Sequence, residues 1–192
     1  MNPQQNGGIK VGIAGAGGIG SSVAHLLVRS GVQHLTLVDF DRVEASNLNR
    51  QFYFHDQIGM DKTKMLAQNL KRINPQVSID AVCERLDVHN IKARFRHCDI
   101  IVEGVDDKES KKQLVEAFAG ISIPVICASG IAGDDCSSIG IKSMGNITIV
   151  GDLITDEANS PLFPPKVHIV AGLMAAEILK WMGSMQDRDR HK

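Results

Sequence analysis

The chain has 192 residues, of which 43% are hydrophobic and 22% charged, a composition typical of one globular domain with a substantial buried core. Because the formal net charge is only −1, no overall electrostatic field would attract nucleic acid or an anionic membrane surface, and we expect neither as a partner. The N-terminal MNPQQNGG resembles neither a signal peptide nor a transit peptide, and no apolar run could span a membrane without including charges, so a cytoplasmic location is expected.

Up to residue 129, apolar runs typical of strands alternate with segments of helical periodicity. Strands are expected over residues 9–15, 34–39, 77–82, 99–104 and 124–129, and helices over residues 18–30, 61–73, 91–97 and 108–118. Strand–helix–strand alternation implies right-handed crossovers and a mainly parallel sheet with helices on both faces. We therefore predict an α/β fold with a doubly wound, Rossmann-like sheet.

The pattern changes after residue 129. Residues 137–150 predict two short strands around a Gly-Asn turn, which would add an antiparallel extension to the sheet. Residues 152–166 form a segment rich in proline and acidic residues that is long for a connector, a length typical of lids and binding segments. Residues 167–183 predict a final helix that is apolar nearly all round, either central to the core or packed on a second subunit, followed by a solvated tail.

The four cysteines are Cys83, Cys98, Cys127 and Cys136, and no two of them form a CxxC pair. This spacing argues against a structural zinc site and against a disulfide framework. We expect reduced thiols and no zinc.

The sequence GAGGIG at residues 15–20 lies between a predicted strand and a predicted helix. Gly15, Gly17 and Gly20 satisfy G-x-G-x-x-G, and Asp39 ends the next strand 19 residues beyond Gly20. A helix N-terminus in this setting binds phosphate, and the carboxylate binds ribose hydroxyls. Taken alone, the pattern favours NAD, so an NAD-dependent oxidoreductase stays an open alternative.

The sequence DFDRVEASNLNRQ, which starts at Asp39, favours a triphosphate instead. Arg50 and Lys62 could neutralise phosphate charge, and Asn47 could donate hydrogen bonds to phosphate oxygens. Asp41 could assist the ribose or a metal ion, or it could serve only the turn. Hydride transfer needs no such cluster, so the motif predicts a nucleotide site in which ATP is the better candidate.

Six segments together resemble the ubiquitin-activating-enzyme-like adenylyltransferases, the family of ThiF, MoeB and HesA. They are GAGGIG (15–20), LVDFDRVEASNLNRQF (37–52), IGMDK (58–62), RINP (72–75), CDIIVEGVDD (98–107) and ASGIAG (128–133). They cover residues 9–150 in register, and the short chain is most similar to the compact ThiF-type enzymes that act on the sulfur carrier ThiS. The resemblance implies one adenylyltransferase domain over residues 1–192, with nucleotide bound by residues 9–133 and the carrier by residues 134–183.

The resemblance also assigns roles by position. Arg50, Lys62 and Asp106 would be catalytic, with Asp106 holding Mg²⁺, and Asp107 stands where the family usually has Asn. The nucleotide-binding residues implied are Gly15, Gly17, Gly18, Gly20, Asp39, Asp41, Ser46, Asn47, Asn49, Arg50, Gln51, Lys62 and Asp107.

The expected reaction is adenylylation by ATP of the C-terminal Gly-Gly carboxylate of a ubiquitin-like sulfur carrier, with residues 152–166 as the lid over its tail. Because residues 151–166 contain no cysteine, sulfur would come from a separate donor protein. The family and the apolar last helix imply a homodimer. A relative that activates a tRNA-bound carboxylate, or a non-catalytic binding partner, remains an alternative.

Overall fold

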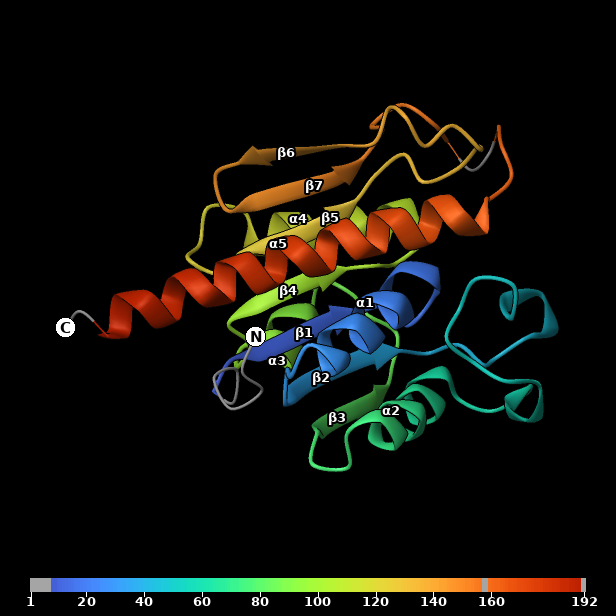
Figure 1. Ribbon diagram of the computed structural model, residues 1–192, viewed down its shortest axis with the longest axis horizontal. Helices are drawn as coiled ribbons and strands as arrows, with labels where there is room; N and C mark the ends of the chain where they lie inside the picture. Colours follow the sequence, from blue (N-terminus) through green and yellow to red (C-terminus); the bar gives the residue numbers. More distant parts are fainter. Residues whose placement is uncertain (1–7, 157–158, 191–192) are drawn as a thin grey trace.

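A single sheet of seven strands, in the order β3-β2-β1-β4-β5-β7-β6, forms the centre of the protein (Figure 1). The computed structural model describes residues 8–156 and 159–190. The strands are β1 (Lys10–Ala14), β2 (His34–Asp39), β3 (Ser78–Cys83), β4 (Ile100–Glu103), β5 (Val125–Ala128), β6 (Gly140–Met144) and β7 (Ile147–Gly151). All neighbouring strands are parallel except β6, which runs antiparallel to β7.

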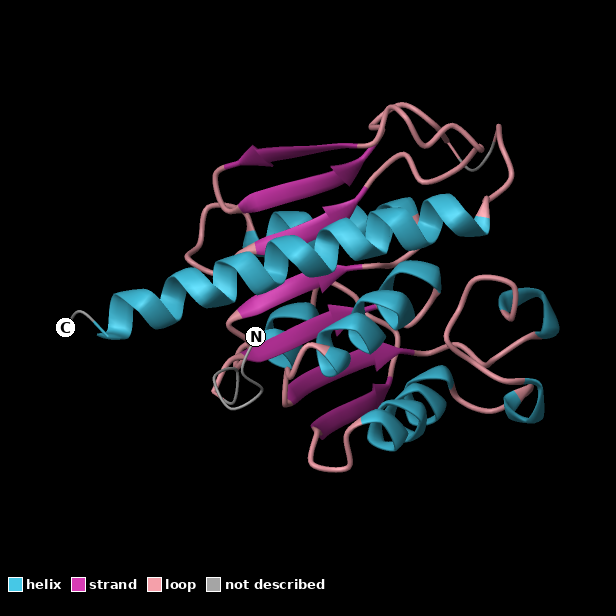
Figure 2. Cartoon of the chain, viewed as in Figure 1, coloured by secondary structure: helices cyan, strands magenta, loops and turns pink. Residues whose placement is uncertain are grey.

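Helices cover both faces of the sheet (Figure 2). They are α1 (Gly18–Arg29), α2 (Lys62–Ile73), α3 (Ile91–Phe95), α4 (Lys108–Phe118) and α5 (Pro164–Arg190). One buried apolar cluster lies between the sheet and α1, α2 and α5, and a second lies under α3 and α4. The predicted doubly wound sheet with an antiparallel extension is therefore confirmed.

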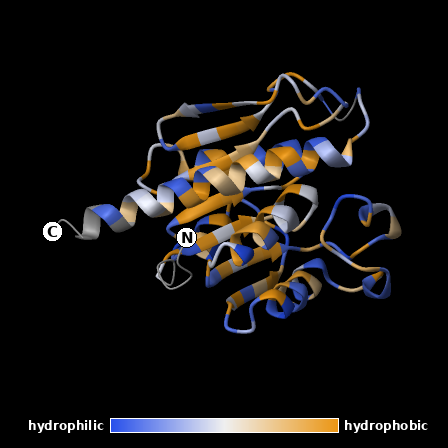
Figure 3. Cartoon of the chain, in the orientation of Figure 1, coloured by the Kyte–Doolittle hydropathy of each residue, from blue (hydrophilic) through white to orange (hydrophobic). Residues whose placement is uncertain are grey.

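The central strands are apolar because helices cover both of their faces. β4 and β5 are buried at every position and β1 at all but its first, whereas the edge strand β6 is exposed throughout. Continuous apolar runs are characteristic of such doubly covered parallel strands. The hydropathy colouring shows these strands as the apolar centre of the molecule (Figure 3).

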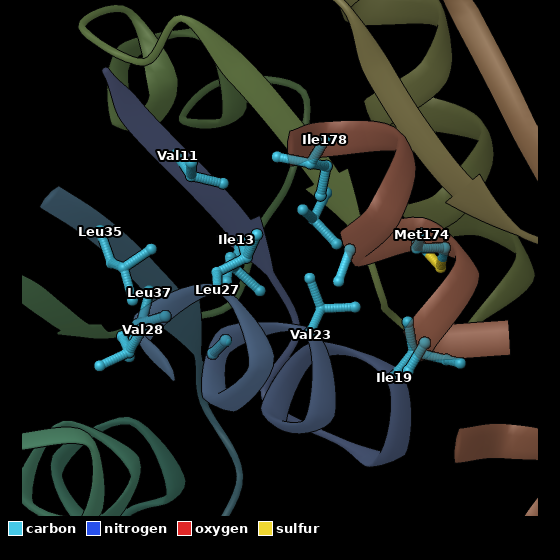
Figure 4. Packing of buried hydrophobic residues seen from close by; sticks show 14 of the residues in the cluster. Val11, Ile13, Ile19, Val23, Leu27, Val28, Leu35, Leu37, Met174 and Ile178 are labelled. Atoms are coloured by element: carbon cyan, nitrogen blue, oxygen red, sulfur yellow. The ribbon is translucent and has the colours of Figure 1, made fainter. Parts of the chain in front are cut away.

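Helix α5 packs along α1 across the front of the sheet. Ile19, Val23 and Leu27 of α1 face Met174 and Ile178 of α5, and all five side chains are at most 4% exposed (Figure 4). Full burial of each such side chain contributes about 1.5–3 kcal/mol. The buried side of α5 thus belongs to the core of this chain.

The bounds predicted for the last helix, 167–183, were too short at both ends. The helix begins at Pro164, because proline is compatible with the first helical turn, where no intrahelical N–H bond is required. It continues past Gly183 to Arg190, and the predicted solvated tail is therefore helical as far as Arg190. A glycine inside a helix costs only about 1 kcal/mol, which the flanking turns can offset.

The connection from β2 to α2 holds two short 3-10 turns, η2 (Ala45–Asn47) and η3 (His55–Gln57), which were not predicted from the sequence.

Within the described residues, none of the helices combines the length and the apolarity needed to cross a bilayer.

Candidate functional site

A cleft of about 480 Å³ lies at the carboxyl ends of the parallel strands. In parallel α/β sheets ligands bind at this edge, and the volume is within the range of about 300–1,000 Å³ typical of small-molecule sites. The cleft is lined by the glycine turn after β1, the end of β2, the loops after β4 and β5, and residues 153–156. Segments far apart in the sequence therefore meet at one site.

The glycines of the turn serve two different purposes. A Cβ on Gly15 would lie 2.5 Å from the Gly104 oxygen, and a Cβ on Gly20 would lie 1.8 Å from the Gly15 oxygen, so both permit close backbone packing. Gly20 does not line the cleft, whereas Gly17 and Gly18 do. No side chain caps α1 at Gly17, so the first backbone N–H groups of the helix remain available to an anion.

Asp39 and Tyr53 hold this turn in place. The Asp39 carboxylate accepts hydrogen bonds from the Ala16 N–H (2.6 Å) and the Asp41 N–H (2.7 Å). The Tyr53 hydroxyl donates to the Ala16 oxygen at 2.7 Å. Burial raises the pKa of Asp39, although the two N–H donors work against that shift, and burial likewise raises the pKa of Tyr53. Asp39 lines the cleft and also holds the backbone of the glycine turn in place, whereas the role of Tyr53 was not predicted.

Lys62, the first residue of α2, lies on the cleft wall with its side chain only 7% exposed. Its Nζ is 2.9 Å from Asp41 Oδ2. Asp41 is 40% exposed, so the pair is open to the cleft from the carboxylate side. The structure therefore brings both predicted residues to the site, as an ion pair.

Arg50 and Gln51 line the cleft, but Ser46, Asn47 and Asn49 do not. The Arg50 guanidinium donates through Nη1 to the Ser46 oxygen (3.0 Å) and to Asn49 Oδ1 (2.9 Å). The nucleotide-binding roles expected for Ser46, Asn47 and Asn49 therefore stay predictions, since these residues lie outside the cleft wall. Ser46 and Asn49 instead hold the guanidinium from outside the cleft.

Asn47 is turned back onto its own segment. Its Oδ1 accepts the Glu44 N–H at 3.1 Å within the η2 turn, and the residue is buried.

Gln51 differs from Asn47, because its Oε1 is buried without a hydrogen-bond partner among the described residues. A buried acceptor without a partner on a cleft wall is free to accept a hydrogen bond from a ligand.

Asp106 and Asp107 follow β4 and both line the cleft. Asp107 caps α4 by accepting from the Ser110 N–H at 2.9 Å, and hydrogen bonds from Ser110 lower its pKa. Asparagine is an equally good N-cap. Asp107 therefore performs a helix-capping task for which the family's Asn is equally suited. Both aspartates are exposed, and among the described residues Asp106 has no such capping role.

A buried ion pair beneath this loop was not predicted. Glu103 is fully buried, its Oε2 lies 3.0 Å from Lys111 Nζ, and its Oε1 accepts the Val105 N–H at 3.0 Å. Lys111 also donates to the Ala128 oxygen at 2.7 Å. Burial raises the pKa of Glu103 in spite of Lys111. The pair joins the ends of β4 and β5 and so restrains the loop that carries Asp106. The sequence signal for this ion pair is the glutamate at the end of the apolar run IIVE.

The mouth of the cleft has two further features. The Arg85 guanidinium lies 5.1 Å from the centre of the exposed Phe40 ring, a flat stacked surface. On the other side, Lys108 Nζ lies 2.7 Å from Asp156 Oδ2, and this pair bridges α4 to the segment 153–156. All four residues line the cleft.

Within residues 8–156 and 159–190, no three His, Cys, Asp or Glu side chains gather closely enough to form a metal site. A hard cation bound by Asp106 would therefore need most of its ligands from phosphate oxygens and water, which is the usual coordination of Mg²⁺.

Comparisons with known proteins agree with this geometry. A family model described as the ThiF family matches residues 6–191. Molybdopterin-synthase adenylyltransferase of Haemophilus influenzae is 32% identical over 155 residues, which are 80% of this chain and 58% of that protein. The Escherichia coli protein of the same name is 26% identical over 180 residues, 90% of this chain and 72% of its own length.

Two solved folds are similar. One is the E. coli tRNA N6-threonylcarbamoyladenosine dehydratase TcdA in complex with ATP, with a TM-score of 0.87, 20% identity, and coverage of 97% of this chain and 90% of that one. The other is E. coli MccB, with a TM-score of 0.77, 23% identity, and coverage of 95% and 57%. The family match spans nearly the whole chain, and this protein therefore belongs to the ThiF family.

Proposed function

We propose that this protein uses ATP to adenylylate the C-terminal Gly-Gly carboxylate of a ubiquitin-like carrier protein. The observation that supports this best is the meeting, at one cleft, of an uncapped helix start, Arg50, the Lys62–Asp41 pair and the exposed Asp106. Relatives named molybdopterin-synthase adenylyltransferase and ubiquitin-like modifier-activating enzyme 5 support the same reaction class. The chain spans 58% of the length of the first of these proteins.

The residues present fit ATP. Gly17 offers an open approach, because a Cβ there would meet only Gln51 Nε2, at 3.8 Å, and phosphate can therefore come close to the backbone. Asp39 would accept from ribose hydroxyls, and the unpaired Gln51 amide would find its partner on the ligand. The adenine ring would lie against the Phe40–Arg85 surface, since aromatic and guanidinium planes stack on bases.

Mg²⁺ fits at Asp106, where it would offset triphosphate charge that otherwise repels an incoming anion. Arg50 and Lys62 would oppose the same charge from the other wall of the cleft. Asp107 would contribute by keeping the start of α4 in place, since its carboxylate is engaged as the cap.

The reaction needs alignment more than proton transfer. A carrier carboxylate is already ionised at neutral pH, so one of its oxygens can attack the α-phosphorus directly while the bond to the bridging oxygen of pyrophosphate breaks. Pyrophosphate leaves with that electron pair, and an acyl-adenylate forms. The chain's own residues hold the two anions together and keep them from repelling each other.

The carrier is proposed to be of the ThiS type, docked on residues 134–183, with residues 152–166 covering its tail. A separate sulfur donor is proposed because residues 151–166 lack cysteine, and because burial raises the pKa of the Cys127 thiol to about 12, which makes it a poor nucleophile. A homodimer and a cytoplasmic location stay predictions.

The test is ATP–pyrophosphate exchange, with a ThiS-type protein ending in Gly-Gly as the probe. We expect exchange that requires the carrier and that falls by about 10²-fold or more in Arg50→Ala and Asp106→Ala. Arg96→Ala is the matched control, because Arg96 is exposed and does not line the cleft. Saturable NAD binding without exchange would overturn the proposal in favour of an oxidoreductase. Exchange driven by a tRNA-bound carboxylate would replace the carrier with a different substrate.

A further inference from the structure

The most deeply buried ion pair among the described residues lies outside the set of residues considered so far. Lys166 Nζ lies 2.7 Å from Asp152 Oδ2, and the two side chains are 0% and 3% exposed. Burying an ion pair costs desolvation free energy on both sides. Lys166 also stands in the first turn of α5, where the helix dipole disfavours a cation. Such a costly arrangement indicates a task beyond simple packing.

The pair joins three segments that border the cleft. Asp152 follows β7 and Lys166 lies in the first turn of α5. The Lys166 ammonium also donates to the Ala132 oxygen, at 2.6 Å, in the loop after β5. The close approach depends on Gly130, which has a φ of +72° and where a Cβ would lie 1.9 Å from Asp152 Oδ1. The pair thus anchors the point at which the segment 152–156 leaves the sheet.

Asp152 holds the conformation of that segment directly. Its Oδ1 accepts from the Ile154 N–H (2.8 Å) and the Thr155 N–H (2.9 Å), and its Oδ2 accepts from the Thr155 hydroxyl (2.8 Å). These bonds enclose Leu153, the one non-glycine residue with a positive φ among the described residues, at +64°. Left-handed backbone is unfavourable for a leucine and persists only where its surroundings impose it.

Glycine would adopt this conformation without strain, so the leucine side chain itself needs an explanation. Leu153 is 45% exposed and Ile154 is 84% exposed, and both line the cleft. They are therefore not held there to complete the core. The triphosphate is charged and the adenine ring has the Phe40–Arg85 surface, so ATP does not need this apolar wall, whereas a peptide entering the cleft can bury it.

We propose that Asp152 and Lys166 are positioning residues that hold Leu153 and Ile154 as the apolar contact surface for the tail of the carrier protein. This inference rests on the proposed function, because it takes the second substrate to be an extended peptide. Leu153 and Ile154 then determine how well the carrier binds and have no part in binding ATP.

The first experiment compares Leu153→Gly with Leu153→Ala. Both remove the apolar side chain, but only glycine also removes the strain, so Leu153→Gly is expected to unfold at a temperature equal to or above that of the wild type and Leu153→Ala at a lower one. In ATP–pyrophosphate exchange with a ThiS-type carrier, both should raise the KM for the carrier by about tenfold while the KM for ATP stays within about twofold. A stable Leu153→Gly protein with an unchanged KM for the carrier overturns the proposal.

The second experiment breaks the ion pair with Lys166→Met and uses Lys180→Met as the control. Lys180 is on the same helix, pairs with Glu177 at 2.6 Å on the surface, and lies outside the cleft. Lys166→Met should accelerate hydrogen exchange at the Ile154 and Thr155 amides and raise the KM for the carrier, Lys166→Arg should restore both, and Lys180→Met should change neither. Unaltered amide exchange in Lys166→Met would overturn the positioning role.

The two proposals fail in different ways. If the wild-type protein shows no carrier-dependent exchange, the proposed function is wrong and the assignment of a carrier tail falls with it. If wild-type exchange is normal and neither Leu153→Gly nor Lys166→Met alters the KM for the carrier, the proposed function stands and only this inference is overturned.

Discussion

Replacing Gly20 by alanine tests whether close backbone packing in the glycine turn requires a residue without a Cβ at this position. A Cβ at this position would lie 1.8 Å from the Gly15 oxygen and 3.2 Å from Ile13 Cγ2. The oxygen belongs to the backbone, so relief requires the turn to open by roughly 1.2 Å. Overpacking typically costs about 1–3 kcal/mol, and a clash with the backbone is expected at the upper end of that range, about 3 kcal/mol. The better helix propensity of alanine offsets about 1 kcal/mol of this cost.

We therefore expect Gly20→Ala to lower the free energy of unfolding by about 2 kcal/mol, which for a chain of this size lowers the Tm by roughly 4–8 °C. Gly17→Ala is the matched control within the same turn, because its Cβ would meet only Gln51 Nε2, at 3.8 Å. It should cost less than about 1 kcal/mol and yet weaken ATP binding, since the new methyl group would stand where phosphate approaches.

Thermal unfolding followed by circular dichroism gives the two Tm values, and isothermal titration with ATP gives the two affinities. The reasoning is refuted if Gly20→Ala unfolds at the wild-type temperature, or if Gly17→Ala proves the less stable of the two. Wild-type ATP affinity in Gly17→Ala would show that phosphate does not approach this turn.

Three further predictions follow from the buried and capping charges. Burial raises the folded-state pKa of Glu103 above its ordinary value of 4.5, so the stability of the wild type relative to Glu103→Gln should be at its full value at and below about pH 4.5 and should fall as the pH rises through the folded-state pKa. Urea unfolding of both proteins across the pH range checks this, and a stability difference that grows with pH contradicts it. Lys166→Met should lower the free energy of unfolding by about 3–5 kcal/mol, because it leaves the Asp152 carboxylate buried without its cation. The double variant Lys166→Met/Asp152→Asn should recover part of that loss. A double-mutant cycle that shows no coupling energy between the two positions would contradict a stabilising interaction between them. Asp107→Asn should keep the Tm and the ATP–pyrophosphate exchange rate of the wild type, whereas Asp107→Ala should lower the Tm because the helix loses its cap. Loss of ATP–pyrophosphate exchange in Asp107→Asn would instead show that the charge of Asp107 is needed for ligand binding.

The fold could be predicted well because its signals are local. The bounds of the strand 34–39 and of the helix 108–118 agree with the structure, since strand pattern, helical periodicity and capping residues all lie within the segment itself. The glycine turn and Asp39 could be placed for the same reason, because their spacing reflects one strand–helix–strand unit.

The parts of the site that were missed depend on contacts between distant segments. Lys166 lies beside Asp152 only because the segment after β7 folds back to start α5 next to the end of that strand. Tyr53 contacts Ala16 although α1 and β2 separate the two residues in the sequence. Nothing local distinguishes these side chains from surface residues. The assignment of Asn47 to the triphosphate stays a prediction. A side chain three residues after Glu44 can also bond to its own segment, as Oδ1 of Asn47 does, and the spacing itself could have suggested this competition.

The packing of α5 on α1 has a consequence for how the protein is made. The apolar side of α1 forms early in translation, yet the helix that covers it is the last element of the domain to leave the ribosome. Val167, which lines the cleft together with Gly18, is synthesised just as late. During synthesis the apolar face of α1 therefore stays exposed until α5 has been made, and it can aggregate in that time. A nascent chain that ends before residue 164 also lacks residues that line the nucleotide cleft.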